Sequence, residues 1–448
     1  MNIENSTNVL LSKDINRIRE GHDISRNSVL YSGILHLKNK DIEIRDLITT
    51  DITRDFNNAI ADSIQVQFYM PSGDYQVDVV PELDTLDFTL IKSYGVNVEL
   101  IERFKFIVLN NTSAKMGSVT ENQKKEELNK QSMQVVVGQA VNILYYATRL
   151  ITVTKALRGV TLQEAISFSF NDFINNPRDI KINGTPIKLD KLNIDPPNNP
   201  NKLNNLILPS HVTVYDMPTE LQDKYGVYNG HIGTYITRDY KNGAYINSAW
   251  VYPLYNPIMV KNRKRKMRLY ASIGFTSRMV DRTFLDSENN LDILVSAEES
   301  NNQIFGQYSA SNGTGVSVLD SNEVTKANPL ENGKSKNKSK ELSTREGFDK
   351  ADGVSFNLSG GQTSNAYKHR TNVLKQKGTT LTVNWNFSMP ELVYPGMTVE
   401  YIYEKFDKDG NSEIKILNGI VQAISSRADV NKKTCHSNIF IFLDPTEN

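Results

Sequence analysis

The sequence has a single cysteine, no net charge and no long apolar run, and each shortage excludes a class of protein. With Cys435 as the only cysteine among 448 residues, no disulfide can form within the chain. Lys plus Arg and Asp plus Glu number 51 each, which excludes a nucleic-acid binder held by overall basicity, because such binding needs an excess of cations. Apolar runs such as 143–147 are far shorter than the ~20 residues of a membrane-spanning helix. Because the first residues also lack a signal-peptide pattern, we expect a chain that neither spans a membrane nor is exported by that route.

The composition favours loops and strands over helices. Hydrophobic residues make up 39% of the chain, and about one residue in nine is asparagine. Asparagine favours turns and caps and is poor in helix interiors. The composition therefore predicts a mainly β protein with minor α.

Alternating hydrophobicity predicts strands in the first hundred residues. Residues 63–70 alternate apolar and polar side chains, which is typical of a half-buried strand. The sequence Pro-Ser-Gly-Asp at 71–74 predicts a turn, and renewed alternation at Tyr75, Val77 and Val79 predicts a second strand. The short spacing between turns indicates an antiparallel sandwich or barrel.

The clearest helix signal begins at Thr161. Thr161 and Glu164 have the spacing of a capping box, in which each side chain bonds the backbone N–H of the other residue. Apolar residues follow at helical spacing up to Asn175, and Asn-Pro at 176–177 ends the pattern.

The last seventy residues return to strand patterns. Leu381, Val383, Trp385 and Phe387 alternate with polar residues, so we expect all four to be buried on one face. Residues 397–406 and 413–424 flank a polar turn and are predicted to pair as a long hairpin. The final strand is apolar on both faces, which indicates either a buried central strand or a subunit interface. Its candidate interface residues are Ile439, Phe440, Ile441 and Phe442.

These patterns predict a mainly β fold with minor α in four segments. They are an N-terminal β domain (1–160), a mixed and Tyr-rich middle region (161–297) that contributes strands to the second β domain, a polar insertion (298–370) and a C-terminal β domain (371–448). The two β domains are expected to be antiparallel barrels or sandwiches. The insertion has few large apolar residues and a Lys/Ser/Asn run, a composition that predicts flexibility outside either β core.

Catalytic patterns are missing. The six histidines are scattered without zinc spacing, no phosphate-binding loop is present, and Cys435 beside His436 is at most half of a nucleophilic site. We therefore expect no enzyme activity and no cofactor or metal. The only concentrated charge is a basic segment between two β segments. It favours a solvated loop, or an electrostatic contact with an acidic partner or with nucleic acid that passes nearby. Its cations are Lys261, Arg263, Lys264, Arg265, Lys266 and Arg268.

The C-terminal order of strand, Pro395-Gly396 turn, polar hairpin and the segment Gly419-Ile420-Val421 resembles the baseplate hub proteins of contractile phage tails and the spike hubs of type VI secretion systems. Residues 42–70 and the capped helix at Thr161 are similar to the start of the first tube-like domain of that family and the helix after it.

The resemblance implies a structural virion protein. In that family two tube-like domains per chain form a pseudo-sixfold ring in a homotrimer, which adapts a hexameric tail tube to a trimeric spike and leaves a channel for DNA. It implies as partners the tail tube, spike, tape measure and other baseplate proteins, with assembly in the host cytoplasm and a place at the virion tail tip. Two alternatives stay open, a tail-associated cell-wall hydrolase and a receptor-binding tail protein.

Overall fold

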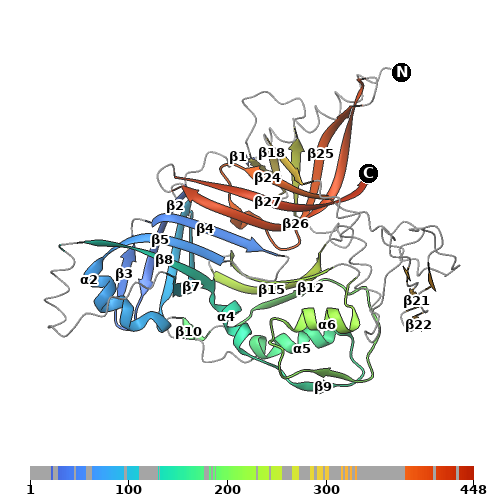
Figure 1. Ribbon diagram of the computed structural model, residues 1–448, viewed down its shortest axis with the longest axis horizontal. Coiled ribbons are helices and arrows are strands. Elements are labelled where there is room, and N and C mark those ends of the chain that lie inside the picture. Colours follow the sequence, from blue (N-terminus) through green and yellow to red (C-terminus); the bar gives the residue numbers. More distant parts are fainter. Residues whose placement is uncertain are drawn as a thin grey trace.

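The structure is a computed structural model of the full chain, and Figure 1 shows its arrangement. It describes residues 22–23, 29–44, 47–56, 63–94, 98–109, 130, 132–175, 181–182, 185–186, 188–228, 231–241, 244–254, 265–271, 283–286, 290–295, 298–301, 314–315, 318–320, 323–324, 328–329, 379–406, 410–429 and 433–447. The predicted class, mainly β with minor α, is confirmed.

Seven strands and a short helical segment form what we call the N-terminal β unit. Its elements are β2 (Val29–His36), β3 (Asp41–Ile44), β4 (Leu47–Asp55), β5 (Ser63–Pro71), α2 (Ser72–Asp74), η1 (Tyr75–Val79), η2 (Val80–Thr85), β6 (Asp87–Tyr94), β7 (Val98–Val108) and β8 (Met133–Asn142). The strands follow the order β4-β5-β8-β7-β6-β2-β3, with antiparallel pairing between neighbours.

In the structure the middle region runs from α4 to β15 and contains most of the helix. Its elements are α4 (Ile143–Leu150), β9 (Lys155–Leu157), α5 (Leu162–Asn175), β10 (Lys181–Ile182), β11 (Thr185–Pro186), β12 (Lys191–Ile194), β13 (Leu206–Leu208), α6 (Met217–Tyr225), β14 (His231–Lys241) and β15 (Ala244–Leu254). They surround their own apolar core, in which α4, α5 and α6 pack with the three-stranded sheet β12-β15-β14. The helix predicted after Thr161 is confirmed, and so is its capping box: Glu164 N donates to Thr161 Oγ1 at 3.2 Å, and Thr161 N donates to Glu164 Oε2 at 2.7 Å.

Most of the remaining strands form what we call the C-terminal β unit. Its elements are β1 (His22–Asp23), β16 (Lys266–Ala271), β17 (Thr283–Leu285), β18 (Leu291–Val295), β19 (Glu298–Asn301), β24 (Thr379–Trp385), η4 (Pro390–Leu392), β25 (Thr398–Phe406), β26 (Ser412–Asp429) and β27 (Thr434–Glu447). Four short strands between β19 and β24 form two small separate sheets: β20 (Thr314–Gly315), β21 (Val318–Asp320), β22 (Glu323–Val324) and β23 (Asn328–Pro329).

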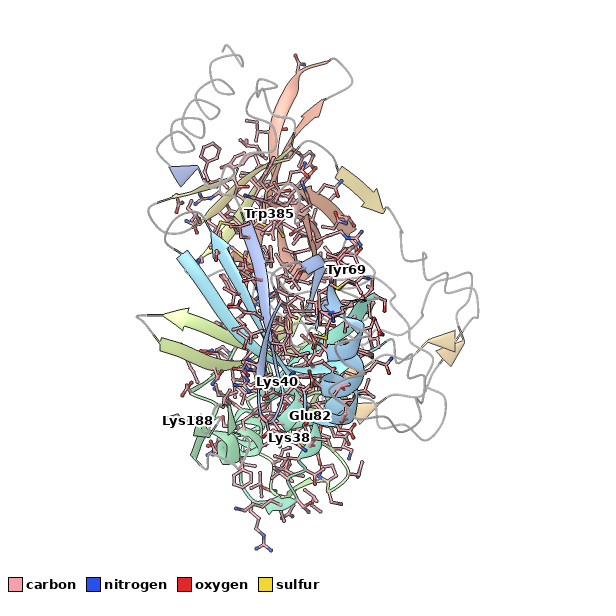
Figure 2. The ribbon with its side chains drawn as sticks, turned by 90° about the vertical axis from the view of Figure 1, so that its left-hand side faces the viewer. Lys38, Lys40, Tyr69, Glu82, Lys188 and Trp385 are labelled. Atoms are coloured by element: carbon pink, nitrogen blue, oxygen red, sulfur yellow. The ribbon has the colours of Figure 1, made fainter. Side chains whose placement is uncertain are left out.

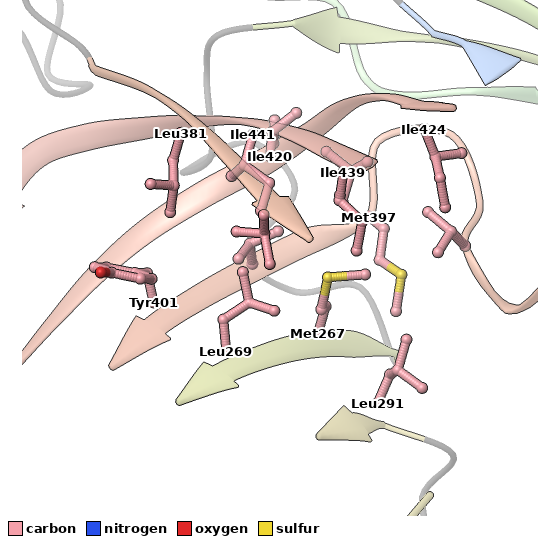
Figure 3. Packing of buried hydrophobic residues seen from close by; sticks show 14 of the residues in the cluster. Met267, Leu269, Leu291, Leu381, Met397, Tyr401, Ile420, Ile424, Ile439 and Ile441 are labelled. Atoms are coloured by element: carbon pink, nitrogen blue, oxygen red, sulfur yellow. The ribbon is translucent and has the colours of Figure 1, made fainter. Parts of the chain in front are cut away.

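The predicted hairpin is confirmed, because β25 and β26 pair antiparallel from Phe406 opposite Ser412 to Thr398 opposite Ile420. Figure 3 shows side chains of this hairpin packing with those of β16, β18, β24 and β27 in one core. Gly419 lies on β26 at a bulge, and a Cβ there would lie 2.6 Å from the carbonyl oxygen of Phe442. The close approach of β27 therefore explains the glycine in the segment Gly419-Ile420-Val421.

The two β units share one sheet. β26 pairs with β4 from Ala423 opposite Asp55 to Ala428 opposite Thr50, so strands continue from β25 through β26 and β4 into β5. Figure 1 shows this as the red strands of the C-terminal unit lying beside the blue strands of the N-terminal unit. Among the described strands, the ends of this sheet, β1 and β3, do not pair with each other, so the sheet is open there.

Three sequence expectations differ from the structure. Tyr75 and Val79 are buried in a helical segment, not a strand, because residues four apart satisfy both the helical period and alternation. Two contacts hold the helical segments η1 and η2 against the β2–β3 turn. Glu82 of η2 accepts a hydrogen bond from the backbone N–H of Lys38, and Asp78 of η1 forms an ion pair with Lys40. Figure 2 labels Lys38, Lys40 and Glu82.

Phe387 is the second correction. Trp385 is buried as predicted, but β24 ends there, and Phe387 adopts a left-handed backbone with φ 53° and is 40% exposed. The strand therefore ends at Trp385, before Phe387, and not after it as the pattern indicates. The third concerns the insertion: residues 298–301, as β19, pair antiparallel with β24, with Ser300 opposite Leu381. Most of 302–370 lies outside the described residues.

Three stacked phenylalanines make Gly138 a sensitive position. The Phe106 ring lies 5.3 Å from that of Phe88 and 6.2 Å from that of Phe68, centroid to centroid, and crosses directly over Gly138. A Cβ on Gly138 would lie 2.0 Å from Phe106 Cζ. We expect Gly138→Ala to lower the free energy of unfolding by about 1–3 kcal/mol, because the ring cannot move without disturbing its neighbours. Urea unfolding measures this loss. If the clash with the Phe106 ring causes it, Gly138→Ala should cost less in a Phe106→Leu background. Equal losses in both backgrounds would contradict that cause.

Candidate functional site: an exposed polar face of the shared sheet

One face of the shared sheet carries short polar side chains in rows that run across both β units. The first row is Asn384, Asn438, Ser425, Thr53 and Ser63, each opposite the next on β24, β27, β26, β4 and β5. The second row is His436, Arg427, Asp51, Gln65 and Gln139, on β27, β26, β4, β5 and β8. We call these ten residues the polar face.

The polar face is defined by strict alternation along each strand. Ser426, next to two members of the face, is buried, as are Ile52 and Ile64 on the neighbouring strands. These residues point into the apolar cores, whereas Thr53, Gln65, Arg427 and Asn438 are exposed. Because side chains alternate between the two sides of a strand, the pairing of β26 with β4 is what aligns the rows.

The polar face is nearly neutral. Its Arg427 and Asp51 side chains lie opposite each other and form an ion pair, with Nε 3.0 Å from Oδ1. Gln139 Nε2 donates to Ser63 Oγ at 2.8 Å, and His436 Nδ1 lies 3.0 Å from Asn386 Oδ1. The face therefore offers hydroxyl and amide groups for water, and its paired charges cancel.

The basic segment lies elsewhere, at β16. Arg268 is buried between two register neighbours, Asp292 on β18 and Glu400 on β25. Its guanidinium lies 3.1 Å from Asp292 Oδ1 and 3.5 Å from Glu400 Oε2. Lys266 also pairs with Glu400. These two cations of the segment therefore neutralise acidic groups of the C-terminal β unit.

Of the other four cations of the segment, Arg265 lies within the described residues. The backbone carbonyl of Arg265 accepts a hydrogen bond from the Tyr394 hydroxyl. Lys261, Arg263 and Lys264 lie outside the described residues.

The final strand lies in the middle of its sheet. β27 pairs with β24 on one edge and with β26 on the other. Ile439, Ile441 and Phe442 are buried by the chain itself, and Phe440 is partly exposed beside the polar face. Of the two alternatives, a buried central strand and a subunit interface, pairing on both edges fits the buried central strand. Among the four residues, Phe440 is the one that keeps exposed surface for a partner.

A buried ionic cluster connects the N-terminal β unit to the turn η4. Lys92 is 1% exposed, and its Nζ lies 3.0 Å from Glu102 Oε2 and 2.7 Å from Glu391 Oε1. Arg54 donates to the carbonyl oxygens of Pro390 and Val393 at 2.9 and 3.1 Å. Burial lowers the pKa of Lys92, but the two carboxylates outweigh it and hold the pKa above its ordinary value.

Sequence patterns alone do not reveal this cluster or the polar face. Glu391 is 299 residues from Lys92, and the rows of the polar face depend on the pairing of β26 with β4. Alternation along each strand is visible in the sequence, but the sequence does not show which strands pair with each other. Among the described residues, no cluster of His, Cys, Asp and Glu is placed to hold a metal ion, and no described helix has the length and apolarity to cross a membrane.

No family model and no curated protein matches the chain. Among solved structures, it is similar to a tail protein from Neisseria meningitidis MC58, at TM-score 0.46 and 11% identity over 93% of this chain and 97% of that one. It is also similar to the E. coli c3393 protein, a type VI secretion component (TM-score 0.43, 9% identity, 91% and 76% covered). A third is the 43 kDa tail protein of prophage MuSo2 from Shewanella oneidensis (TM-score 0.43, 9% identity, 92% and 96% covered).

Proposed function

We propose that the chain is a structural protein of a phage tail tip, a hub whose copies form a trimeric ring between tail tube and spike. The polar face of the sheet lines the passage through which DNA leaves. The observation that carries this proposal is the continuity of the polar face across both β units, from β24 to β8. The resemblance of the C-terminal residues to baseplate hubs supports it from the sequence.

The chemistry of the polar face suits a passage for a polyanion. Duplex DNA carries one negative charge per about 1.7 Å of its axis. A wall rich in unpaired Lys and Arg would bind the phosphates and hold the DNA, whereas unpaired carboxylates would repel it. The paired Arg427 and Asp51 among hydroxyl and amide groups do neither, so a hydrated polymer can slide past.

Site-specific labelling tests the proposal. The native thiol gives little background, because Cys435 is buried and burial raises the pKa of its thiol. Thr53→Cys places a thiol on the polar face, and Lys188→Cys, at a position labelled in Figure 2, places one on the middle region, outside the polar face. After labelling with maleimide nanogold, electron microscopy of the assembled full chain should show gold inside a central opening for Thr53→Cys and outside it for Lys188→Cys.

Two results would contradict the proposal. Gold from Thr53→Cys on the outer rim would remove the polar face from the passage, and particles without an opening would remove the ring. The proposal also includes that the chain is not an enzyme. Clearing of a cell-wall substrate in a zymogram by the purified chain would favour the hydrolase alternative instead.

A further inference from the structure

The two β units repeat the same arrangement of five strands. In the N-terminal β unit five neighbouring strands follow the order β4-β5-β8-β7-β6, and in the C-terminal β unit five follow the order β19-β24-β27-β26-β25. Counted along the chain, both orders are first, second, fifth, fourth and third strand. Every pairing between neighbours is antiparallel in both units. Over these strands the C-terminal β unit is therefore a structural repeat of the N-terminal β unit.

The repeat extends to the register of the strands. One row of opposite residues in the N-terminal β unit consists of Thr53, Ser63, Val141, Lys105 and Asp87. The row at the same place in the C-terminal β unit consists of Asn301, Thr380, Phe442, Ile420 and Thr398. The two rows align the units residue by residue.

A hydrogen bond and the pattern of burial support this alignment. Just beyond the first row, the backbone N–H of Phe106 donates to the carbonyl of Leu86 at 3.0 Å. Just beyond the second row, the N–H of Val421 donates to the carbonyl of Met397 at 3.1 Å. The second strands also match buried residues with buried residues, Ile64, Val66 and Phe68 with Leu381, Val383 and Trp385.

The fourth strand of each unit continues past the beginning of the third strand. In the C-terminal β unit, β26 pairs with β25 as far as Ile420 opposite Thr398, and its continuation pairs with β4 from Ala423 to Ala428. This continuation forms the junction between the two β units. In the N-terminal β unit, the pairing of β7 with β6 ends at Lys105, and β7 continues to Val108.

The continuation of β7 has one open edge. Leu109, directly after β7, donates its N–H to the carbonyl of Val137 on β8. Successive residues of a strand turn their N–H and C=O groups to opposite edges, so those of Val108 point away from β8. No described strand pairs with β7 on that edge beyond β6. β26 uses the same edge to pair with β4.

The first strand of the C-terminal β unit also has an open edge. β4, the first strand of the N-terminal β unit, pairs with β5 on one edge and with β26 on the other. Its counterpart β19 pairs with β24, and no other described strand pairs with it. One chain thus contains one complete junction, β26 with β4, and the two separate halves of a second, β7 and β19. Open strand edges are templates for pairing with another chain.

The two halves of the second junction lie at opposite ends of the shared sheet. The strands β24, β27, β26, β4, β5 and β8 lie between β19 and β7. At about 4.8 Å between neighbouring strands, β19 and β7 are about 34 Å apart along the sheet. The second junction therefore needs a second copy of the chain.

The alignment also gives the register of the second junction. Val137 of β8 corresponds to Asn438 of β27, because both lie four residues before the members of the aligned rows on these strands. Leu109 bonds to Val137, and Ser425 lies opposite Asn438, so Leu109 corresponds to Ser425. The Leu109 side chain is 53% exposed and leaves room for a neighbour.

We propose that the open edge of β7 in one copy pairs antiparallel with β19 of a second copy, in a contact that repeats the junction of β26 with β4. In that junction Ser425 lies opposite Thr53, so Leu109 of one copy lies opposite Asn301 of the other. The contact joins two different surfaces and is head-to-tail, which closes a ring when repeated around an axis. The inference deepens the proposed function, on whose ring it rests, because it names the strands that continue the shared sheet from one copy into the next.

Cysteine cross-linking of the assembled full chain tests this register. The double variant Leu109→Cys/Asn301→Cys places two thiols opposite each other across the proposed contact. Mild oxidation should link up to three chains on a non-reducing gel, and reduction should return single chains. Leu109→Cys and Asn301→Cys as separate variants should stay unlinked. An equal mixture of the two should give linked pairs and nothing larger, because each chain carries one of the two thiols.

Val108→Pro tests the strand contact without thiols. Proline lacks the backbone N–H and is tolerated on an edge strand where that N–H faces away from the paired strand. Because the N–H of Val108 points to the open edge, the variant should keep the thermal melt of the unmodified chain and lose the assembled species in sedimentation. Val108→Ile keeps the N–H and should assemble like the unmodified chain. Assembly of Val108→Pro with an unchanged melt would overturn the pairing of β7 with β19.

The chain supplies a matched control for the cross-link. Thr53→Cys/Ser425→Cys places thiols at the corresponding positions of the junction within the chain, so oxidation should consume both without linking chains. If this control closes, Leu109→Cys/Asn301→Cys does not, and microscopy still shows a ring, the inference is wrong and the proposed function stands. Linked products larger than three chains support the strand contact and contradict the trimeric ring. An unmodified chain that sediments as a monomer at high concentration contradicts both.

Discussion

Trp385→Ala is expected to lower the free energy of unfolding by about 3–5 kcal/mol, which is the cost of removing a large buried aromatic side chain. Trp385 is 1% exposed within the core of the C-terminal β unit. Its indole Nε1 donates to Thr283 Oγ1 at 2.7 Å. The substitution therefore leaves a cavity and a buried hydroxyl without its donor. Chemical unfolding followed by circular dichroism measures the change.

Phe387 provides the matched control. It is two residues from Trp385 and is aromatic, but it is 40% exposed and follows the end of β24. Phe387→Ala should cost less than about 1 kcal/mol, as surface substitutions usually do. Trp385→Phe keeps much of the volume and removes the hydrogen bond, so its loss should lie between the two. Equal losses for Trp385→Ala and Phe387→Ala would show that burial does not govern this strand.

Local features of the fold were predictable from the sequence. The capping box at Thr161 and the hairpin of β25 and β26 are confirmed because each depends on residues close together in the chain. Local pattern was misleading where two periods coincide, as at Tyr75 and Val79. It also failed at Phe387, where backbone conformation and not hydrophobicity ends the strand.

The pairing of strands far apart in the chain could not be predicted from the sequence. Nothing in residues 50–55 identifies β26 as the neighbour of β4, yet that pairing joins the two β units and aligns the polar face. Likewise Arg268 belongs to a conspicuous basic run, but the acidic partners that neutralise it arrive from β18 and β25. A charged residue in the sequence adds to the surface charge only where the fold does not place an opposite charge beside it.

The ionic cluster of Lys92, Glu102 and Glu391 gives the second large effect. Lys92→Met is expected to lower the free energy of unfolding by about 3–5 kcal/mol, because it leaves carboxylates buried without their cation. The pKa of Lys92 lies above its ordinary value. The ion pairs that raise this pKa stabilise the fold fully at pH values below the pKa of the unfolded lysine. This stabilisation is lost only as the pH rises through the pKa of the folded state. The loss should therefore be constant across the neutral range.

A double variant separates charge balance from packing. Glu391→Gln added to Lys92→Met removes one of the two carboxylates that the first substitution leaves without their cation, so the two substitutions together should cost less than their sum. Lys40→Met is the control, because Lys40 pairs with Asp78 near the surface, where ion pairs contribute about 0–1 kcal/mol. Urea unfolding of the four variants measures all terms. Strict additivity, or a Lys40→Met loss as large as that of Lys92→Met, would contradict the view that Lys92 and Glu391 hold the turn η4 against the N-terminal sheet by balanced buried charge.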